Sequence, residues 1–268
     1  MAEVAKPGFE VVIITGASSG IGRATAEKLA EQGKVLILLA RQKAPLKAMI
    51  TRLRQQQPEG TFIAIAGDLA NRQECEAVVD SLRHTLNCQP CRLVGFIHCA
   101  GIGTPTGDLQ HWKPDDLEAA LAVNVVAPLK LVQALLPYLD GNAQSHVHPC
   151  RIVLVGAGID RRAQPGTGTY GISKLALRRL FEQLILDLAS YRAIVALFQP
   201  GMVDTPGLRQ HIRVASSLGL PHAEYLHQRL AQGDCLMPES VGDALSDLLN
   251  QVPIEEFSGH EWHARQLI

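Results

Sequence analysis

Two side chains capable of acid–base chemistry, Tyr170 and Lys174, stand four residues apart in the sequence. Residues four apart share one face of a helix, so a helix here would place the lysine ammonium beside the phenol. A nearby positive charge favours phenolate, and the pair therefore predicts a tyrosine pKa lowered from about 10 toward neutral pH. Tyr170 could then donate a proton to a carbonyl, or accept one from an alcohol.

A glycine-rich turn follows an apolar run near the start of the chain and precedes a helical pattern. Its glycines would supply free backbone angles, a close approach to a pyrophosphate, and tight packing of the helix on the sheet. The helix would point its free N–H groups and the positive end of its dipole at the phosphates. The residues expected at the cofactor are Gly16, Ser18, Ser19, Gly20, Ile21 and Gly22. An ordinary tight turn between strand and helix is the alternative.

The end of the next apolar run discriminates between the two nicotinamide dinucleotides. An acidic residue there would bind the ribose hydroxyls of NAD, but the sequence has Arg41 and Gln42 after Ala40. No carboxylate would repel a 2′-phosphate, and the Arg41 guanidinium could bind one. The sequence therefore predicts NADP(H) as the cofactor, with a solvated surface arginine as the alternative for Arg41.

Apolar runs alternate with segments of helical period along the chain, a pattern typical of βα units on a parallel sheet. Strands are expected at 11–15, 35–40, 62–66, 93–99, 152–155, 194–198 and near residue 261. Helices are expected near 20–32, 43–56, 71–87, 115–139, 170–189 and 240–250, the third beginning with a capping box of Asn71 and Glu74. The predicted fold is one Rossmann-type, doubly wound α/β domain of about seven strands over residues 1–268. The segment 206–237 lacks a strand pattern and is the expected substrate lid.

Bulk properties exclude several other classes of protein. The chain is 47% hydrophobic and 19% charged, with a net charge of −1, which predicts a compact fold and argues against a nucleic-acid partner. We expect a cytoplasmic protein, because the sequence shows neither a secretory signal pattern nor an uninterrupted apolar membrane span. The six cysteines are scattered, so reduced thiols are expected and no metal site is predicted.

With these residues in view, nearly the whole chain resembles the short-chain dehydrogenase/reductases. Six motifs of that family occur in the right order: Thr15 through Gly22, Asp68-Leu69, Ala100-Gly101, Asn124, Tyr170-x-x-x-Lys174, and the Pro200-Gly201 segment that continues through Val203 and Thr205. Within the family, the residues after Arg41 and the region after Pro200 look most like the sepiapterin- and benzil-reductase branch.

The resemblance implies roles for these residues. Asp68 and Leu69 would lie beside the adenine, and Ala100 and Gly101 would border the cofactor. The segment that includes Pro200, Gly201, Val203 and Thr205 would wrap the nicotinamide. Lys174 would also hold the nicotinamide ribose, Asn124 would support a proton-relay water, and Tyr170 would be the acid–base catalyst. A homodimer or homotetramer would form through the helices at 115–139 and 170–189.

The most informative departure from the family pattern is the missing serine. The family places a substrate-binding serine thirteen residues before the tyrosine, where this chain has Ala157. Loss of one preorganised donor typically costs about 10²–10³ in rate. Three interpretations stay open: slow or specialised reduction of a carbonyl with Tyr170 alone; a substitute donor from Asp160, Thr167, Thr169 or the substrate; or an NADP(H)-binding regulatory or scaffold protein without chemistry.

Other residues allow both a functional and a structural interpretation. His98 and Cys99 replace the two asparagines before Ala100; we expect the histidine beside the cofactor cleft in a structural role, and the cysteine as an apolar substitute rather than a reactive thiol. Basic residues near the expected substrate space would suit an anionic substrate or simply be solvated: Arg161, Arg162, Arg209, His211 and Arg213.

Two pairs of cysteines could be mistaken for functional motifs. Cys88 and Cys91 have redox or metal spacing without a second pair, so we interpret them as coincidental. Cys91 and Cys150 each open a strand pattern, and neighbouring parallel strands would place their thiols about one strand spacing, roughly 5 Å, apart.

Overall fold

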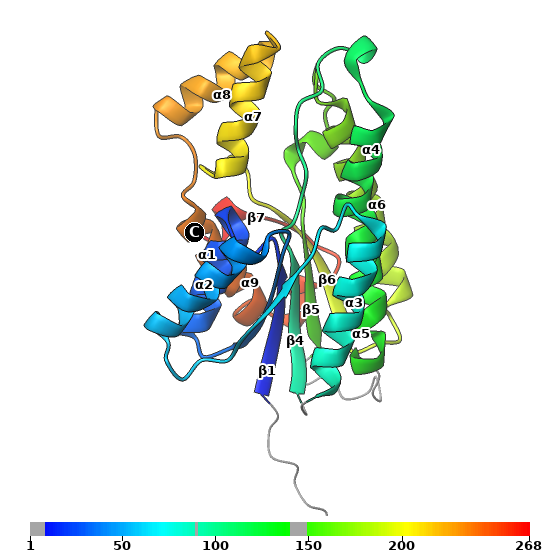
Figure 1. Cartoon of the computed structure of the whole chain (residues 1–268), viewed down its shortest axis with the longest axis vertical. Coiled ribbons are helices and arrows are strands. Elements are labelled where there is room, and N and C mark those ends of the chain that lie inside the picture. Colours follow the sequence, from blue (N-terminus) through cyan, green and yellow to red (C-terminus); the bar gives the residue numbers. More distant parts are fainter. Residues whose placement is uncertain (1–8, 89–90, 140–148) are drawn as a thin grey trace, which may run out of the picture.

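The fold is a single twisted sheet with helices on both faces, as a computed structural model of the chain shows (Figure 1). The structure describes residues 9–88, 91–139 and 149–268. Seven strands form one sheet in the order β3-β2-β1-β4-β5-β6-β7, and every neighbouring pair is parallel. The strand order reverses direction beside β1, which is the switch point where doubly wound sheets bind dinucleotides. The predicted fold class is confirmed.

All seven expected strands are present. Their bounds are β1 Phe9–Thr15, β2 Val35–Ala40, β3 Phe62–Ala66, β4 Cys91–His98, β5 Cys150–Val155, β6 Ala193–Gln199 and β7 Glu261–His263. Most are runs of valine, isoleucine and leucine buried on both faces, as central parallel strands require. Differences from the predicted bounds are confined to strand ends, such as the earlier start of β4 at Cys91.

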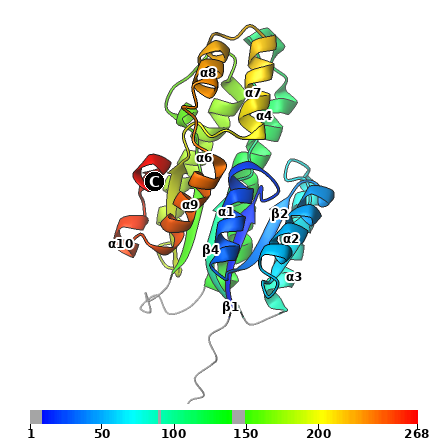
Figure 2. The ribbon, with the colours of Figure 1, turned by 90° about the vertical axis from the view of Figure 1, so that its left-hand side faces the viewer.

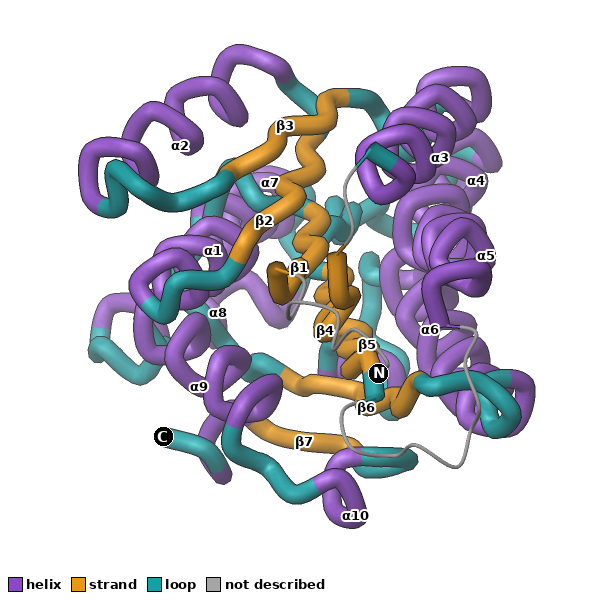
Figure 3. The backbone as a smooth tube through the Cα atoms, turned by 90° about the horizontal axis from the view of Figure 1, so that it is seen from below, coloured by secondary structure: helices purple, strands orange, loops and turns teal. Residues whose placement is uncertain are grey.

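The helices form one layer on each face of the sheet (Figure 3). One layer holds α1 Gly20–Glu31, α2 Lys43–Gln56 and α9 Pro238–Asn250. The other holds α3 Arg72–Asn87, α4 Pro114–Leu121, α5 Ala127–Leu139 and α6 Gly168–Asp187. Shorter helical segments are η1 Leu109–His111, η2 Ala122–Val126, η3 Gly158–Asp160, α10 Ile254–Phe257 and η4 Ala264–Gln266. The capping box at α3 is confirmed in part: Asn71 accepts from the N–H groups of Gln73 and Glu74.

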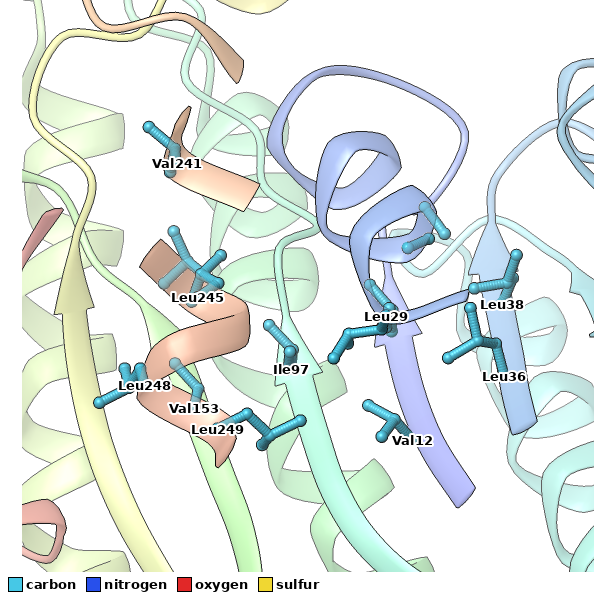
Figure 4. Packing of buried hydrophobic residues seen from close by; sticks show 14 of the residues in the cluster. Val12, Leu29, Leu36, Leu38, Ile97, Val153, Val241, Leu245, Leu248 and Leu249 are labelled. Carbon is cyan, nitrogen blue, oxygen red and sulfur yellow. The ribbon is translucent and has the colours of Figure 1, made fainter. Parts of the chain in front are cut away.

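The core between α1, α9 and the sheet fixes the position of the glycine-rich turn. Leu29 of α1 and Leu245 and Leu248 of α9 are fully buried against Val12 and Ile97 (Figure 4). Close contact is possible because Gly242 meets the Ala24 backbone, where a Cβ would lie only 2.7 Å from a carbonyl carbon. This packing holds the first turn of α1 at the carboxyl end of β1.

The expected helix at 115–139 is interrupted by a π-helical segment. The chain runs from α4 through η2 to α5 without leaving the helix, and the wider turn at η2 carries Asn124. A straight α-helix was expected; π segments inside helices occur mostly at functional sites. By length and composition 114–139 could span a membrane, but half of its most apolar stretch is buried inside the protein, as in a helix packed on a sheet.

The predicted lid segment is helical. It contains α7 Pro206–Ser217 and α8 Pro221–Ala231, which stand beyond the carboxyl ends of the strands (Figures 1 and 2). Thr205 caps α7 by accepting the Leu208 N–H at 3.1 Å. A parallel bridge between Val203 and Leu236 closes the segment at its base. The two helices therefore form one insertion whose ends are joined by the bridge between Val203 and Leu236.

The proposed alignment of Cys91 with Cys150 is wrong. β4 pairs Gly95 with Arg151, so Cys150 falls level with the residue before Gly95 and Cys91 lies beside Phe9 instead. The cause is the extra length of β4 at its start, which the sequence pattern did not reveal. All six cysteines are free, and residues 89 and 90 of the Cys88–Cys91 motif lie outside the described residues.

Candidate active site

The turn between β1 and α1 is shaped by two glycines. Gly16 has a φ of 67°, and a Cβ there would lie 2.9 Å from the backbone nitrogen of Ala100. A Cβ at Gly22 would lie 2.4 Å from the Gly16 oxygen. Ser19 is the N-cap of α1, but its side chain makes no capping hydrogen bond. The backbone of the turn is thus packed tightly against Ala100 and against the first turn of α1. The Ser19 hydroxyl does not occupy the helix N-terminus, where a phosphate would bind.

A cavity of about 360 Å³ opens in front of this turn. Eight of the predicted cofactor residues line it: Gly16, Ser18, Ser19, Arg41, Asp68, Leu69, Ala100 and Gly101. The lining also includes residues that the sequence analysis did not name, among them Gln42, Pro45, Ile65, Gly67, Ile102 and Val123. They follow strand ends without a recognisable motif, so only their position at the same edge of the sheet brings them together. The cavity is lined by residues that follow β1, β2, β3 and β4 at the carboxyl edge of the sheet, where doubly wound sheets bind nucleotides.

The end of β2 carries a cation that has no counter-ion among the residues that the structure describes. Arg41 is exposed and lines the cavity, and within the described residues it makes no ion pair or side-chain hydrogen bond. Asp68 is held by its own turn, where its Oδ1 accepts the Ala70 N–H at 2.9 Å. The guanidinium is therefore free to bind an added phosphate at this end of the cavity.

The segment after β6 returns toward the glycine-rich turn. Gly201 has a φ of 71°, and the Thr205 methyl group lies 3.2 Å from where a Gly20 Cβ would be. Val203 is buried beneath the lid. The segment does not line the 360 Å³ cavity, but it passes beside the turn from which that cavity begins.

Asn124 is the centre of a buried hydrogen-bond network. Its Oδ1 accepts the Ile102 N–H at 3.0 Å, and its Nδ2 donates to the Ile102 carbonyl at 3.0 Å and to Ser173 Oγ at 2.8 Å. Ser173 in turn donates to the Tyr170 carbonyl at 2.8 Å. The sequence analysis missed Ser173, although its place one residue before Lys174 puts it on the inner face of the same helix. The network ties the loop after β4 to the helix that carries the tyrosine.

The predicted lowering of the Tyr170 pKa is wrong for this conformation. Burial raises the pKa of Tyr170 to about 12, and the Asp160 carboxylate adds to this shift. Lys174 Nζ donates to the Val155 carbonyl at 2.9 Å and lies 5.9 Å from the tyrosine ring centroid. Burial also lowers the pKa of Lys174 to about 8. The lysine is on the predicted face, but the loss of hydration around both groups outweighs its attraction for a phenolate. Tyr170 is therefore a protonated donor at neutral pH.

Ala157, at the position where the family pattern has a serine, lies in the turn after β5. Ala157 is partly exposed and precedes η3. Of the proposed substitute donors, Asp160 is an acceptor: its Oδ2 accepts from Arg178 Nε at 2.9 Å and from Gln199 Nε2 at 3.0 Å. Thr167 donates to the Gln164 carbonyl at 2.9 Å. Thr169 is buried, and no hydrogen bond of its hydroxyl is observed within the described residues.

A buried ion network that the sequence analysis missed supports this turn. Arg178 of α6 contacts Asp160 and also makes two bonds of 2.8 and 3.0 Å to the Glu261 carboxylate on β7. These bonds, led by Arg178, lower the pKa of Glu261 to about 2. Asp160 Oδ1 and Gln199 Oε1 remain buried without a partner in the described chain. The three charged residues are at least 18 positions apart in sequence, so no local pattern predicts that they pair.

The two arginines proposed for the substrate pocket lie on the turn that follows η3. Arg161 pairs with Glu261 of β7, and Arg162 is exposed. A contact of either arginine with a substrate stays a prediction. Arg209 of the lid likewise pairs with Asp204 at 2.6 Å. A larger open groove of about 750 Å³ runs along the free edge of β3 between α2 and α3, but none of the predicted site residues lines it.

His98 has a structural role, as expected. It is fully buried; its Nδ1 accepts from Thr15 Oγ1 at 2.9 Å and its Nε2 donates to the Val123 carbonyl at 3.2 Å. The Thr15 hydroxyl accepts the Ala100 N–H at 3.0 Å. Burial lowers the pKa of His98 to about 3, so the ring is neutral. Cys99 packs against the apolar core, and burial raises its pKa to about 12, which favours an inert thiol.

This geometry agrees with what the chain resembles. The family model described as short chain dehydrogenase matches residues 10–213, and the chain belongs to that family. An uncharacterised oxidoreductase of Listeria monocytogenes is 32% identical over 180 residues, which cover 67% of this chain and 68% of the relative. A 3-amino-tetrahydro-pyrrolizinone reductase of Xenorhabdus hominickii is 29% identical over 195 residues, covering 73% and 62% of the two chains.

Solved structures show the same fold over almost the whole chain. YwfH, named as an NADPH dependent reductase involved in bacilysin biosynthesis, has a TM-score of 0.78 at 20% identity, with 96% of both chains covered. The L-sorbose reductase of Gluconobacter frateurii, solved with NADPH and L-sorbose, has a TM-score of 0.78 at 21% identity, covering 96% of this chain and 95% of that one. The class is thus an oxidoreductase of the short-chain type.

Proposed function

We propose that this protein is an NADP(H)-dependent oxidoreductase that transfers hydride between the nicotinamide and a carbonyl or alcohol substrate, at a rate limited by Ala157. The observation that carries the proposal is that one 360 Å³ cavity is lined both by Arg41, which has no ion pair among the described residues, and by Gly101, which lies next to the Asn124 network. The names of YwfH and of the sorbose reductase, both with NADPH, agree with this choice of dinucleotide.

The residues present fit a bound dinucleotide. The backbone at Gly16 packs so closely on Ala100 that no side chain could stand there, and the N-cap Ser19 leaves its helix end free of a side-chain hydrogen bond. Arg41 would hold the 2′-phosphate, Asp68 and Leu69 the adenine end, and Lys174 the nicotinamide ribose. When bound, the cofactor supplies or accepts the hydride.

The chain's own groups supply the proton. Tyr170, protonated at neutral pH, can donate to a carbonyl oxygen as it gains charge, which favours the direction of reduction. Lys174 and Ser173 fix the helix around it, and Asn124 holds the loop that borders the nicotinamide end of the cavity. The second oxygen-binding donor of the family is absent at Ala157, so the developing oxyanion has one donor where relatives have two.

A catalytically silent NADP(H)-binding regulatory or scaffold protein is the second candidate. It is favoured by Ala157 and by the covering of the Tyr170 ring: a Cβ at Gly103 would lie only 3.0 Å from its Cε2. The two candidates separate cleanly in experiment. We expect NADPH to bind and to be oxidised slowly across a panel of carbonyl compounds; binding with no oxidation by any of them would favour the silent protein.

We also propose a homodimer or homotetramer in the cytoplasm. Exposed apolar side chains gather on η2 and α6, the helices that the sequence analysis expected at a subunit interface, and include Val126, Ile172, Leu175 and Leu186. Leu175, 55% exposed, is the most direct probe. Light scattering should give at least a dimer for the unmodified chain and a smaller species for Leu175→Glu; a monomer before substitution contradicts the proposal.

A further inference from the structure

Two histidines of the lid are bonded to each other and to the loop that covers the catalytic tyrosine. His211 of α7 bonds through Nδ1 to the Gly103 carbonyl at 2.8 Å, and through Nε2 to Nε2 of His222 of α8 at 3.1 Å. Gly103 lies on the Tyr170 ring, as the 3.0 Å approach of its Cβ position shows. A chain of contacts therefore runs from α8 through α7 and Gly103 to the phenol ring.

We propose that His211 and His222 form a proton-sensitive latch that holds the lid on the loop over Tyr170 and releases it as the pH falls. The consequence for catalysis rests on the proposed function of Tyr170. The latch itself is a property of the lid and does not depend on turnover.

The hydrogen bonds determine where the protons lie. A carbonyl oxygen only accepts, so His211 Nδ1 carries a proton and, in the neutral ring, its Nε2 is an acceptor. His222 must then donate from Nε2, which leaves its Nδ1 without a proton. That nitrogen is buried and has no partner in the described part of the chain. The closed arrangement is thus complete with both rings neutral.

Protonation of either histidine ring disrupts this arrangement of hydrogen bonds. A second proton on His211 would make two N–H groups face each other across 3.1 Å unless His222 changes tautomer. A proton on His222 Nδ1 would be buried without an acceptor. Burial accordingly lowers the pKa of His222, and the His211 ring lowers it further by a smaller amount. The latch is therefore fully formed above the ordinary histidine pKa, about 6.5, and weakens as the pH falls below it through the lowered value.

The charged groups near the lid are bonded to other residues. Within the described part of the chain, no carboxylate is therefore bonded to either histidine ring, where it would stabilise the protonated form and oppose opening. Within the described residues those pairs are Arg209 with Asp204, Arg213 with Gln210, Arg229 with Asp234, Glu224 with Gln228, and Asp108 with His111. The Tyr170 phenol ring lies against Gly103, and its raised pKa keeps the phenol neutral over this pH range. Apolar contacts such as Leu220 on Gly166 also hold the lid but do not titrate.

Hydrogen–deuterium exchange of α7 and α8 in the full chain, corrected for the intrinsic pH dependence of exchange, tests the latch without any substrate. In the unmodified protein we expect exchange in both helices to accelerate by about tenfold per pH unit below about pH 6.5, one proton being linked to opening. In His222→Gln the amide cannot titrate, and it can donate to a neutral His211 or turn its oxygen to accept from a protonated one, so exchange should stay slow down to pH 5.5. In His211→Phe it should be fast at every pH.

His227→Gln is the matched control, because His227 is exposed on the same helix and should leave the pH response unchanged. Unaltered exchange of α1 and α9 shows that each variant is folded. Exchange that does not respond to pH in the unmodified protein, or a response that survives in His222→Gln, overturns the latch. A protein that never oxidises NADPH but shows these responses would overturn the proposed activity alone.

Discussion

The cofactor half and the substrate half of this site differ in how closely they follow the family. Around the cavity from Gly16 to Leu69, the predicted residues lie where the motifs place them, and Arg41 has no competing partner among the described residues. Around Tyr170, the serine is replaced by Ala157, a buried ion network supports the turn, and a loop lies on the phenol ring. The first half is built from backbone and short turns, whereas the second depends on side chains from separate elements.

In the proposed function, cofactor binding and turnover therefore depend on different residues of one fold. Cofactor binding would use the tight packing of Gly16 on Ala100 and the nearby Arg41 cation. Turnover would require a donor for the oxyanion, an accessible phenol and an open lid at the same time. The following substitutions separate the two halves, from the largest expected effect to the smallest.

Tyr170→Phe should remove most of the activity in the substrate half. Loss of the proton donor should reduce kcat by about 10²–10⁴-fold for any carbonyl substrate that the unmodified protein reduces. NADPH affinity, measured by nicotinamide fluorescence, should stay within about twofold, because the cavity is untouched. Retained turnover would show that Tyr170 is not the acid.

Ala157→Ser should restore the missing donor. We expect kcat to rise by about 10²–10³-fold, since one oxyanion donor is typically worth that much. The site can take the hydroxyl because Ala157 is partly exposed. Ala157→Val, which adds bulk without a donor, is the control and should not increase the rate. Equal rates in the serine and valine variants would indicate that this position does not face the substrate.

Arg41→Ala tests the cofactor half. A charge-assisted bond to the 2′-phosphate is worth about 1.5–3 kcal/mol, so the Kd of NADPH should rise by roughly 10- to 100-fold. The Kd of NADH should change little, which makes it the internal control. A parallel loss for both dinucleotides, or for neither, would contradict the assigned preference.

Glu261→Gln probes the ion network under the Ala157 turn. Arg178 holds the pKa of Glu261 at about 2, below the ordinary value, so its charged form stabilises the folded protein above about pH 4.5 and this contribution disappears as the pH falls toward 2. After allowance for partial exposure, urea unfolding at pH 7 should show a loss of about 1–2 kcal/mol. The difference in the free energy of unfolding between the variant and the unmodified protein should shrink between pH 5 and pH 3. A difference that stays constant over this range would contradict a stabilising role for the charged Glu261.

Much of the fold could be predicted because the strands are apolar runs separated by turn residues. The bounds of β2 and β3 agree with the predicted ranges, and errors elsewhere are confined to ends where neighbouring strands extend the pairing, as at Cys91. The π segment at Asn124 was missed because the spacing of apolar residues that predicts a helix does not distinguish a local π turn from an α turn. The pKa of Tyr170 was predicted in the wrong direction because helix spacing reports the neighbour and not the burial.

The succession of strands and helices along the chain, the glycine-rich turn and the absence of a carboxylate after β2 were determined by the sequence alone, since each depends on the types of residues that stand next to one another in the chain. Only the tertiary structure decided that Asp160 accepts from Arg178, that Arg161 turns to Glu261, and that His211 reaches Gly103. Those contacts join residues between 18 and 108 positions apart. Their partners are chosen by packing and by the need of buried charges and donors to be satisfied, which no local pattern expresses.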